Sequence, residues 1–314
     1  MALANGLFAR RAERKDPPAG KFVEVDGVRL HYIDRGTGRP IVLLHGNGTF
    51  AQDWLISGVL DQLATDHRVI AFDRPGFGYS KRPRSRIWTA YAQAALIHKA
   101  LLLLDIREPV VVGHSWGTLV ALALALDYPL NTAALVLLSG YYFPTVRTDV
   151  AALSGPAIPI LGDVIRYTIS PALGWLLSKQ VSRKLFAPAP VSRRFRRRFP
   201  LSLSLRPSQI RASAADTALM IPAAASLLDR HHELEMPVVI MAGNGDRIVD
   251  ISLQSRRLHA ELPNSSMHEA DGIGHMIHYT ARDIVVAAIA AEADATAPNE
   301  RAKARLASDR LPLD

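Results

Sequence analysis

Three side chains have the types, and stand in the order, that acyl transfer through a serine requires: Ser115, Asp246 and His275. A serine hydroxyl is a weak nucleophile at neutral pH, so it needs a histidine base within hydrogen-bond reach. The histidine in turn needs a carboxylate that holds its tautomer and orientation. We therefore predict that Ser115 attacks the carbonyl carbon of a substrate, with His275 as base and Asp246 as its orienting carboxylate. The product of this step is an acyl-enzyme that water can hydrolyse.

The serine lies in the sequence Gly113-His114-Ser115-Trp116-Gly117, between an apolar run and a helical pattern. The run Pro109–Val112 predicts a buried strand, and Thr118–Tyr128 predicts a helix. A strand, then Gly-x-Ser-x-Gly, then a helix is the order of elements found around a sharp turn that exposes the serine hydroxyl. An ordinary Gly-Ser turn is the alternative, which the flanking elements and the later partners disfavour. His114 is interpreted as structural, because it points off the other side of the turn.

The acid and the base each follow one of the last two predicted strands. Asp246 lies in the loop after Val238–Met241, and Asp250, which is expected to cap the following helix, is the alternative acid. His275 follows the last predicted strand, and His278 is the weaker alternative base. Parallel strands place their carboxyl ends at one edge of a sheet, so both loops are predicted to reach the edge that carries the serine.

Acyl chemistry also needs hydrogen-bond donors for the negative charge that develops on the carbonyl oxygen. We expect the backbone N–H groups of Trp116 and Asn47 to form this oxyanion hole. Asn47 lies in His45-Gly46-Asn47-Gly48, the loop that follows the apolar strand Ile41–Leu44. A plain glycine loop is the alternative interpretation, which its position at the end of a central strand disfavours.

Strands and helices alternate along most of the chain, which predicts an α/β fold with a mostly parallel central sheet flanked by helices. An Asp-Gly turn joins the first two predicted strands in a hairpin. The predicted strands are 22–25, 28–33, 41–44, 68–72, 109–112, 134–138, 238–241 and 266–270, and the predicted helices are 53–63, 91–104, 118–128, 252–262 and 281–293.

The alternation stops between residues 141 and 236, where no buried strand is evident and nine of the twenty prolines occur. Short helices separated by proline and glycine fit this composition, so we predict a helical cap inserted between two strands of the sheet. The α/β core then comprises residues 21–140 and 237–295. Residues 1–20 are predicted to be a flexible basic tail, and residues 296–314 a loose polar tail.

The composition indicates a globular protein with a sizeable core, since 49% of the 314 residues are hydrophobic and 21% are charged. There is no cysteine, which excludes disulfides, thiolate catalysis and cysteine-ligated metal. We expect no metal and no cofactor. No signal peptide or membrane span is evident in the sequence, so a cytoplasmic location is expected.

The net charge of +8 depends on one short run that contains five arginines: Arg193, Arg194, Arg196, Arg197 and Arg198. Without them the net charge is +3. Such a run is typical of a solvated helix face, and weak attraction to an anionic membrane surface is the alternative. No nucleic-acid partner is expected, because no recognisable binding module accompanies the arginines.

Over residues 22–293 the chain resembles the α/β-hydrolases that carry a helical cap. The motifs that carry the resemblance are, in order, His45-Gly46, Asp73-Arg74-Pro75-Gly76-Phe77-Gly78-Tyr79-Ser80, the turn at Ser115, Gly245-Asp246 and Gly274-His275. The resemblance implies a Ser-His-Asp triad with an oxyanion hole. It says little about the substrate, because this superfamily hosts many chemistries on one scaffold.

Some details are similar to the haloalkane dehalogenases, in which the residues that correspond to Asn47 and Trp116 bind halide. Those enzymes and the related epoxide hydrolases use an aspartate nucleophile, whereas attack by Ser115 on an alkyl halide or epoxide would leave a stable ether. The leading prediction is therefore hydrolysis of a carboxylic ester with a hydrophobic acyl or alcohol group. The expected partner is this small-molecule ester, and interfacial lipase action is a variant of the same prediction.

Two other functions remain open. One is carbon–carbon bond hydrolysis of vinylogous diketones, although Gly48-Thr49 and Met276 differ from the pattern that is usual in those enzymes. The other is a non-catalytic α/β-hydrolase that binds a small apolar ligand, which the presence of all three candidate triad residues disfavours.

Overall fold

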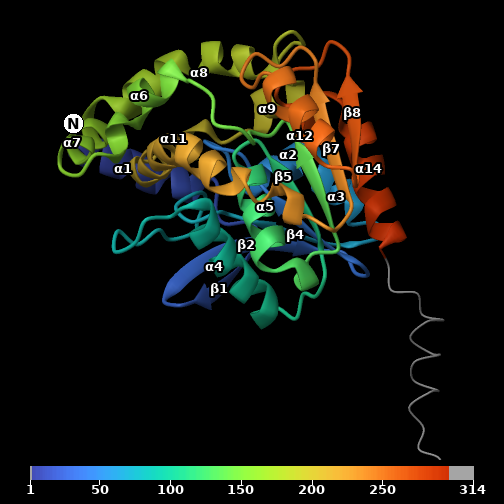
Figure 1. The fold of residues 1–314 in the computed structure, drawn as a ribbon. Helices are drawn as coiled ribbons and strands as arrows, with labels where there is room; N and C mark the ends of the chain where they lie inside the picture. The colour runs from blue at the N-terminus through green and yellow to red at the C-terminus, as the bar shows by residue number, and fades with distance from the viewer. Residues whose placement is uncertain (1, 297–314) are drawn as a thin grey trace, which may run out of the picture.

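The computed structural model describes residues 2–296, which fold around a sheet of eight strands (Figure 1). The order across the sheet is β1-β2-β4-β3-β5-β6-β7-β8; β1 and β2 are antiparallel to their neighbours and the other strands are parallel. The strand bounds are β1 Lys21–Val25, β2 Val28–Arg35, β3 Pro40–Leu44, β4 Arg68–Phe72, β5 Val110–His114, β6 Ala134–Leu138, β7 Val238–Gly243 and β8 Ser265–Ala270. The predicted fold class is confirmed.

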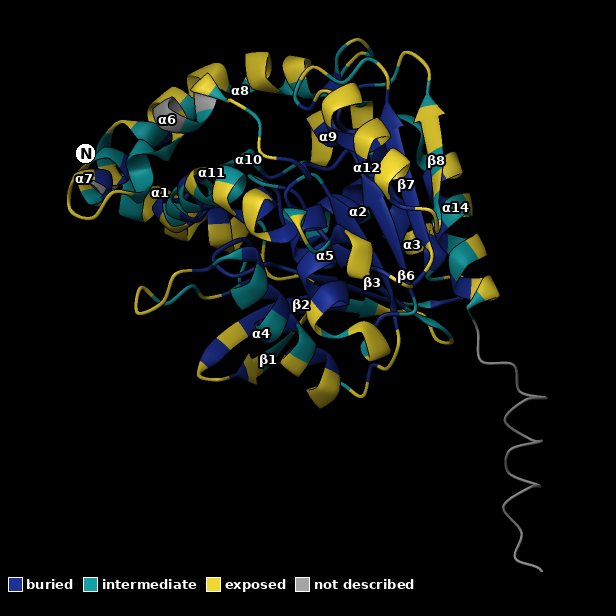
Figure 2. Cartoon of the chain, in the orientation of Figure 1, coloured by how far each residue is buried: buried dark blue, intermediate teal, exposed yellow. Residues whose placement is uncertain are grey.

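Helices cover both faces of this sheet because successive apolar side chains of a strand point to opposite faces. In β3, Val42 and Leu44 pack with one set of helices, whereas Ile41 and Leu43 pack with the other. The first set contains α4 Ala90–Leu103, α5 Gly117–Asp127 and α12 Arg257–Glu261; the second contains α2 Gln52–Ser57, α3 Val59–Leu63 and α14 Arg282–Ala295. Figure 2 shows the central strands as the most deeply buried part of the fold.

The segment between β6 and β7 is helical, as predicted for the cap. Its helices are α6 Thr148–Ser154, α7 Leu161–Thr168, α8 Ser170–Phe186, α9 Arg193–Arg198, α10 Leu201–Ser204 and α11 Pro207–Leu228, with short 3₁₀ turns at Gly155–Ala157 and His231–Glu233. The end of α11 packs into the core through Ala223, Ala224 and Leu227, while α8 spans the top of the molecule in Figure 1. The cap is therefore an insertion between two neighbouring strands of one sheet.

The prediction of a flexible tail at residues 1–20 is wrong for its first part, because Ala2–Lys15 forms helix α1. This helix packs on the cap rather than extending into solvent. Ala12 is buried in a small apolar cluster with side chains of α10 and α11, and Glu13 pairs with Arg206 at 2.7 Å. The three arginines of this segment make its sequence resemble a solvated tail, and the few apolar residues that dock it were not recognised. The predicted C-terminal tail, from residue 297 onward, lies outside the described residues.

Two predicted helices differ locally from the structure. The helix expected over residues 53–63 is divided into α2 and α3 at Gly58, whose φ of +88° is left-handed and ends a right-handed helix. The helix expected over 252–262 begins as a π-helix, Ser252–Arg256, before it continues as α12. A short helix α13, Ile277–Thr280, precedes α14, and a 3₁₀ turn, Pro129–Asn131, follows α5.

None of the helices between residues 2 and 296 combines the length and the apolar composition that a bilayer crossing requires.

Candidate active site

The turn between β5 and α5 holds Ser115 in a conformation that few residues other than glycine adopt. Its φ is +53°, so the backbone is strained at the residue predicted to be the nucleophile. Neighbouring backbone leaves no room for side chains at Gly113 and Gly117. A Cβ at Gly117 would lie 2.4 Å from the carbonyl oxygen of Leu44, and one at Gly113 would lie 2.7 Å from Cα of Thr118. The structure therefore requires both glycines of the motif.

The three residues of the predicted triad lie in one hydrogen-bonded chain. Ser115 Oγ lies 2.9 Å from His275 Nε2, and His275 Nδ1 lies 2.7 Å from Asp246 Oδ2. The side chains of His275 and Asp246 are only 3% and 2% exposed. The second carboxylate oxygen of Asp246 accepts the backbone N–H groups of Ile248, at 2.7 Å, and Val249, at 3.1 Å. These bonds orient the carboxylate toward the histidine.

The alternative acid and base take part in other contacts. Asp250 accepts the backbone N–H groups of Ser252, at 2.8 Å, and Leu253, at 3.0 Å, which is the capping role expected for it. His278 is fully buried and its Nε2 lies 3.0 Å from a carboxylate oxygen of Asp53. Neither of the two is hydrogen-bonded to Ser115 in the part of the chain that the structure describes.

A group of mostly buried aromatic and polar side chains packs beside His275; it consists of His114, His278, Asp53 and Tyr279. His114 donates from Nε2 to the backbone carbonyl of His275 at 3.0 Å, and its ring lies 4.4 Å from that of His278. The hydroxyl group of Tyr279 donates to a carboxylate oxygen of Asp53 at 2.6 Å, and the other oxygen of this carboxylate faces His278. Burial, together with His278 and His275, lowers the pKa of His114 well below its usual value. His114 is therefore a neutral donor that fixes the backbone of His275.

The two predicted oxyanion donors come from two loops: Asn47 lies in the loop after β3, and Trp116 follows Ser115 in the turn between β5 and α5. The ring of His45 shapes the loop after β3: its Nδ1 donates to the carbonyl of Gly46 at 2.7 Å, and its Nε2 accepts the N–H of Arg74 at 3.0 Å. Burial, and then the charge of Arg74, lower the pKa of His45 well below its usual value, so the ring is neutral. Among the described residues, no protein acceptor receives the backbone N–H of Asn47 or of Trp116. Both donors remain available for a ligand.

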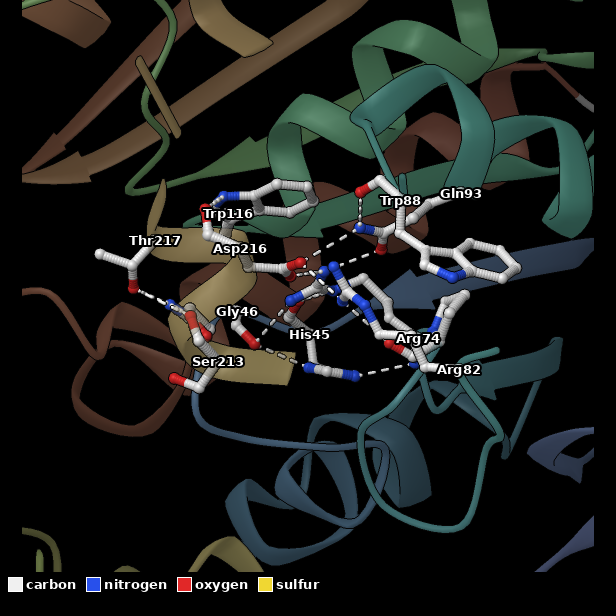
Figure 3. Close-up of polar contacts among 12 residues, drawn as sticks. His45, Gly46, Arg74, Arg82, Trp88, Gln93, Trp116, Ser213, Asp216 and Thr217 are labelled. Atoms are coloured by element: carbon white, nitrogen blue, oxygen red, sulfur yellow. Dashed lines mark hydrogen bonds and ion pairs between the residues drawn. The ribbon is translucent and has the colours of Figure 1, made fainter. Parts of the chain in front are cut away.

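A buried arginine holds this loop from the side (Figure 3). The Arg74 guanidinium donates to the carbonyl of His45 at 2.8 Å and to that of Gly46 at 3.2 Å. It also pairs with Asp216 of the cap helix α11 at 2.6 Å, and both side chains are 0% exposed. Arg82 pairs with the other oxygen of Asp216 at 2.8 Å. One carboxylate of the cap thus pairs both with the arginine that holds the oxyanion loop and with a second arginine.

Helix α11 also engages the side chains of both residues whose backbone N–H groups were predicted to form the hole. Asn47 donates from Nδ2 to the carbonyl of Ser213 at 3.1 Å and to Oγ1 of Thr217 at 2.9 Å. The indole of Trp116 donates to the carbonyl of Asp216 at 2.8 Å. The halide-binding donors of a dehalogenase are therefore already satisfied within this protein.

Comparison with known proteins agrees with this architecture. A family model for the alpha/beta hydrolase fold matches residues 39–281. The chain belongs to this family. Over 143 residues it is 35% identical to 2-hydroxymuconate semialdehyde hydrolase of Pseudomonas sp. (strain CF600), which covers 42% of this chain and 48% of that relative, about half of its length.

Two longer matches extend the comparison. Over 268 residues this α/β-hydrolase is 27% identical to 2-hydroxy-6-oxo-2,4-heptadienoate hydrolase of Pseudomonas putida, a match that covers 82% of this chain and 90% of that relative. The structure of an esterase from Thermogutta terrifontis superposes with a TM-score of 0.72 at 21% identity, and the match covers 89% of this chain and 100% of that one. The second match establishes similarity of fold.

The cap of this α/β-hydrolase is attached at a second place, beside His275. Phe186 at the end of α8 and Phe195 of α9 pack with Met276 in a small apolar cluster. The backbone that joins these helices passes so close that a Cβ at Gly274 would lie 2.2 Å from the carbonyl oxygen of Ala187. The loop that carries the candidate base is therefore held between the sheet and the cap.

The sequence analysis missed the roles of Arg74 and Asp216. Arg74 belongs to a motif quoted for the family resemblance, but its contacts cannot be read from the motif. A signal for Asp216 exists in the composition: it is the first carboxylate after Asp163, in the middle of a helix of small and apolar residues. A single acid in such a segment indicates a buried partner of opposite charge.

Proposed function

We propose that the protein is a serine hydrolase that cleaves carboxylic esters through an acyl-enzyme. The observation that carries the proposal is the chain of hydrogen bonds from Ser115 through His275 to Asp246, next to two backbone N–H groups that have no protein acceptor within residues 2–296. This arrangement supplies a nucleophile, a base, an orienting carboxylate and an oxyanion hole, which together are the requirements for acyl transfer.

In the proposed reaction, Ser115 Oγ attacks the carbonyl carbon of the ester while His275 Nε2 accepts the hydroxyl proton. Asp246 holds the imidazole and stabilises its positive charge. The N–H groups of Asn47 and Trp116 donate to the oxyanion. His275 then protonates the leaving alkoxide as the carbon–oxygen bond breaks. Water attacks the acyl-enzyme with His275 again as base. His275 then returns this proton to Ser115 Oγ as the acyl–oxygen bond breaks, and the acid product leaves.

Hydrolysis of the carbon–carbon bond of a dienoate is the second candidate, because the relative from Pseudomonas putida is named as a 2-hydroxy-6-oxo-2,4-heptadienoate hydrolase. A dienoate carries a carboxylate, which needs a cationic partner when it leaves water. Among the described contacts of the oxyanion loop the cation is Arg74, whose side chain is 0% exposed and whose three nitrogens all donate to protein acceptors. This observation favours an uncharged ester over a carboxylate-bearing substrate.

The test is hydrolysis of p-nitrophenyl esters from acetate to palmitate, with 2-hydroxy-6-oxo-2,4-heptadienoate measured in parallel. We expect turnover of the esters, and Ser115→Ala should lower kcat by a factor of about 10⁴–10⁶ without a loss of folding. Ser208→Ala, which removes an exposed hydroxyl from α11, is the control and should retain activity. Turnover of the dienoate alone would replace the proposal with the second candidate, and ester turnover that survives Ser115→Ala would refute the nucleophile.

A further inference from the structure

The outer face of the cap carries large apolar side chains in solvent. Six residues of α7, α8 and their junction are between 48% and 70% exposed: Val164, Ile169, Leu173, Trp175, Leu176 and Val181. We name this surface the apolar cap face. It lies on the part of the molecule that Figure 2 shows as the exposed arch of α8. Of these six residues, Ile169, Leu173 and Leu176 recur at helical spacing and share one side of α8. Several large apolar side chains exposed on neighbouring turns often mark a contact site.

The exposure follows from the way in which α8 is built. From Ser170 to Ser182 its inner side consists of Pro171, Gly174, Ser178 and Ser182, which are buried or half-buried and recur at helical spacing. A Cβ at Gly174 would lie 2.5 Å from a methyl group of Leu205, so the helix lies against the cap at close range. An ordinary surface helix turns its large apolar residues inward. Before its last turn, where Phe186 is buried, this helix turns small residues inward and large apolar residues outward.

The same segment carries an unusual charge distribution. From residue 164 to residue 215 there is no aspartate or glutamate, whereas there are eleven lysines and arginines. The exposed cations of α8 and α9 make no ion pair among the described residues; they are Lys179, Arg183, Lys184, Arg193, Arg194, Arg196, Arg197 and Arg198. The side of the cap next to the apolar face is therefore strongly basic.

Apolar and basic side chains meet in one hollow of about 480 Å³ between α1, α8 and α9. Trp175 lies in its lining together with Phe8 and Lys15 of α1 and Arg197 and Arg198 of α9, and Asp16 is the acidic residue there. An amphipathic ring beside several cations is suited to the boundary between lipid headgroups and acyl chains.

We propose that the apolar cap face rests on an anionic lipid bilayer. The apolar side chains of α7 and α8 enter the outer acyl region, and the cations of α8 and α9 contact lipid phosphates. Charge decides between the possible occupants: a second copy of this chain would bring a second set of unpaired cations against the first, whereas an anionic bilayer complements them. This inference goes beyond the proposed reaction and does not depend on it.

The test is flotation of the full chain with vesicles of phosphatidylcholine alone and of phosphatidylcholine with phosphatidylglycerol at three to one. We expect at least tenfold more binding to the anionic vesicles, with a decrease as salt is raised. Leu173→Ser/Trp175→Ser/Leu176→Ser and, separately, Arg197→Gln/Arg198→Gln should each lower binding at least tenfold. Absent or equal binding to the two vesicles would overturn the proposal.

Matched controls separate a specific surface from general hydrophobicity or charge. Leu102→Ser/Leu103→Ser/Leu130→Ser removes three exposed leucines at the opposite edge of the sheet, and Arg35→Gln/Arg107→Gln removes two exposed cations there. Both should bind as the wild type does, and all variants should keep a cooperative thermal transition. A wild-type dimer in solution that the cap-face triple variant converts to a monomer would assign the face to a second copy instead.

Discussion

Replacing Asp216 with leucine should cost about 3–5 kcal/mol of unfolding free energy, because it leaves the Arg74 charge buried without its counter-ion. The two side chains are 0% exposed and 2.6 Å apart. At that distance and an effective dielectric constant of 20, Coulomb's law gives an attraction of about 6 kcal/mol. The expected loss is smaller, because Gln93 and two backbone carbonyls still accept hydrogen bonds from the guanidinium.

The double variant Arg74→Met/Asp216→Leu removes both members of the pair. Its loss of unfolding free energy should be smaller than the sum of the two single losses by about 2 kcal/mol or more. The assay is urea unfolding at neutral pH, with the m-value checked in each variant. Lys99 and Asp26 form a control pair at 2.7 Å whose side chains are 52% and 43% exposed, and the same cycle there should give a coupling below about 1 kcal/mol. Single costs at Arg74 and Asp216 that add to within about 0.5 kcal/mol would refute the reasoning.

Three further predictions follow from the site. Burial lowers the pKa values of His45 and His114, so the unfolded chain binds more protons than the folded protein as pH falls below about 6.5. Unfolding free energy should then decrease with falling pH by up to about 1.4 kcal/mol per pH unit for each histidine, and an unchanged slope in His114→Asn would contradict this account. Gly274→Ala should destabilise the protein by about 1–3 kcal/mol because its Cβ meets the backbone between α8 and α9, whereas Gly155→Ala, with nothing within 4 Å of its Cβ, should be within about 0.5 kcal/mol of wild type in urea unfolding. Trp116→Phe removes the indole N–H that donates to the backbone carbonyl of Asp216. It should lower the unfolding free energy by about 1–3 kcal/mol. It keeps the backbone N–H, so a loss of kcat much above tenfold would argue against a backbone role.

The strands and the candidate triad were predictable because local patterns determine them. Uninterrupted apolar runs such as Ile41–Leu44 can be buried only between two helical layers. Asp246 follows such a run and His275 follows the next strand, β8, so both come to one sheet edge whatever the details of the loops. The pairing of the strands then brings the loops of Ser115, Asp246 and His275 together, because β5, β6, β7 and β8 are neighbours in sequence order across the sheet.

The parts that were not predictable depend on contacts between distant segments. Arg74 and Asp216 are 142 residues apart, and no local pattern records their pairing. Helix α1 has a net basic sequence and becomes ordered through the few apolar contacts of Ala12 against the cap. The break between α2 and α3 depends on the left-handed conformation of Gly58, which a helical apolar stripe does not reveal.

The two attachments of the cap have a consequence for how the chain folds. Asp216 ties α11 to the loop after β3, and Phe186 and Phe195 tie α8 and α9 to the loop after β8. Each of these loops packs against the inserted helices, and the helices in turn bury part of their inner side against the two loops. We therefore expect the insertion to unfold together with the sheet and not as an autonomous domain. Excising it would remove the side chains that contact the loops of Asn47 and His275.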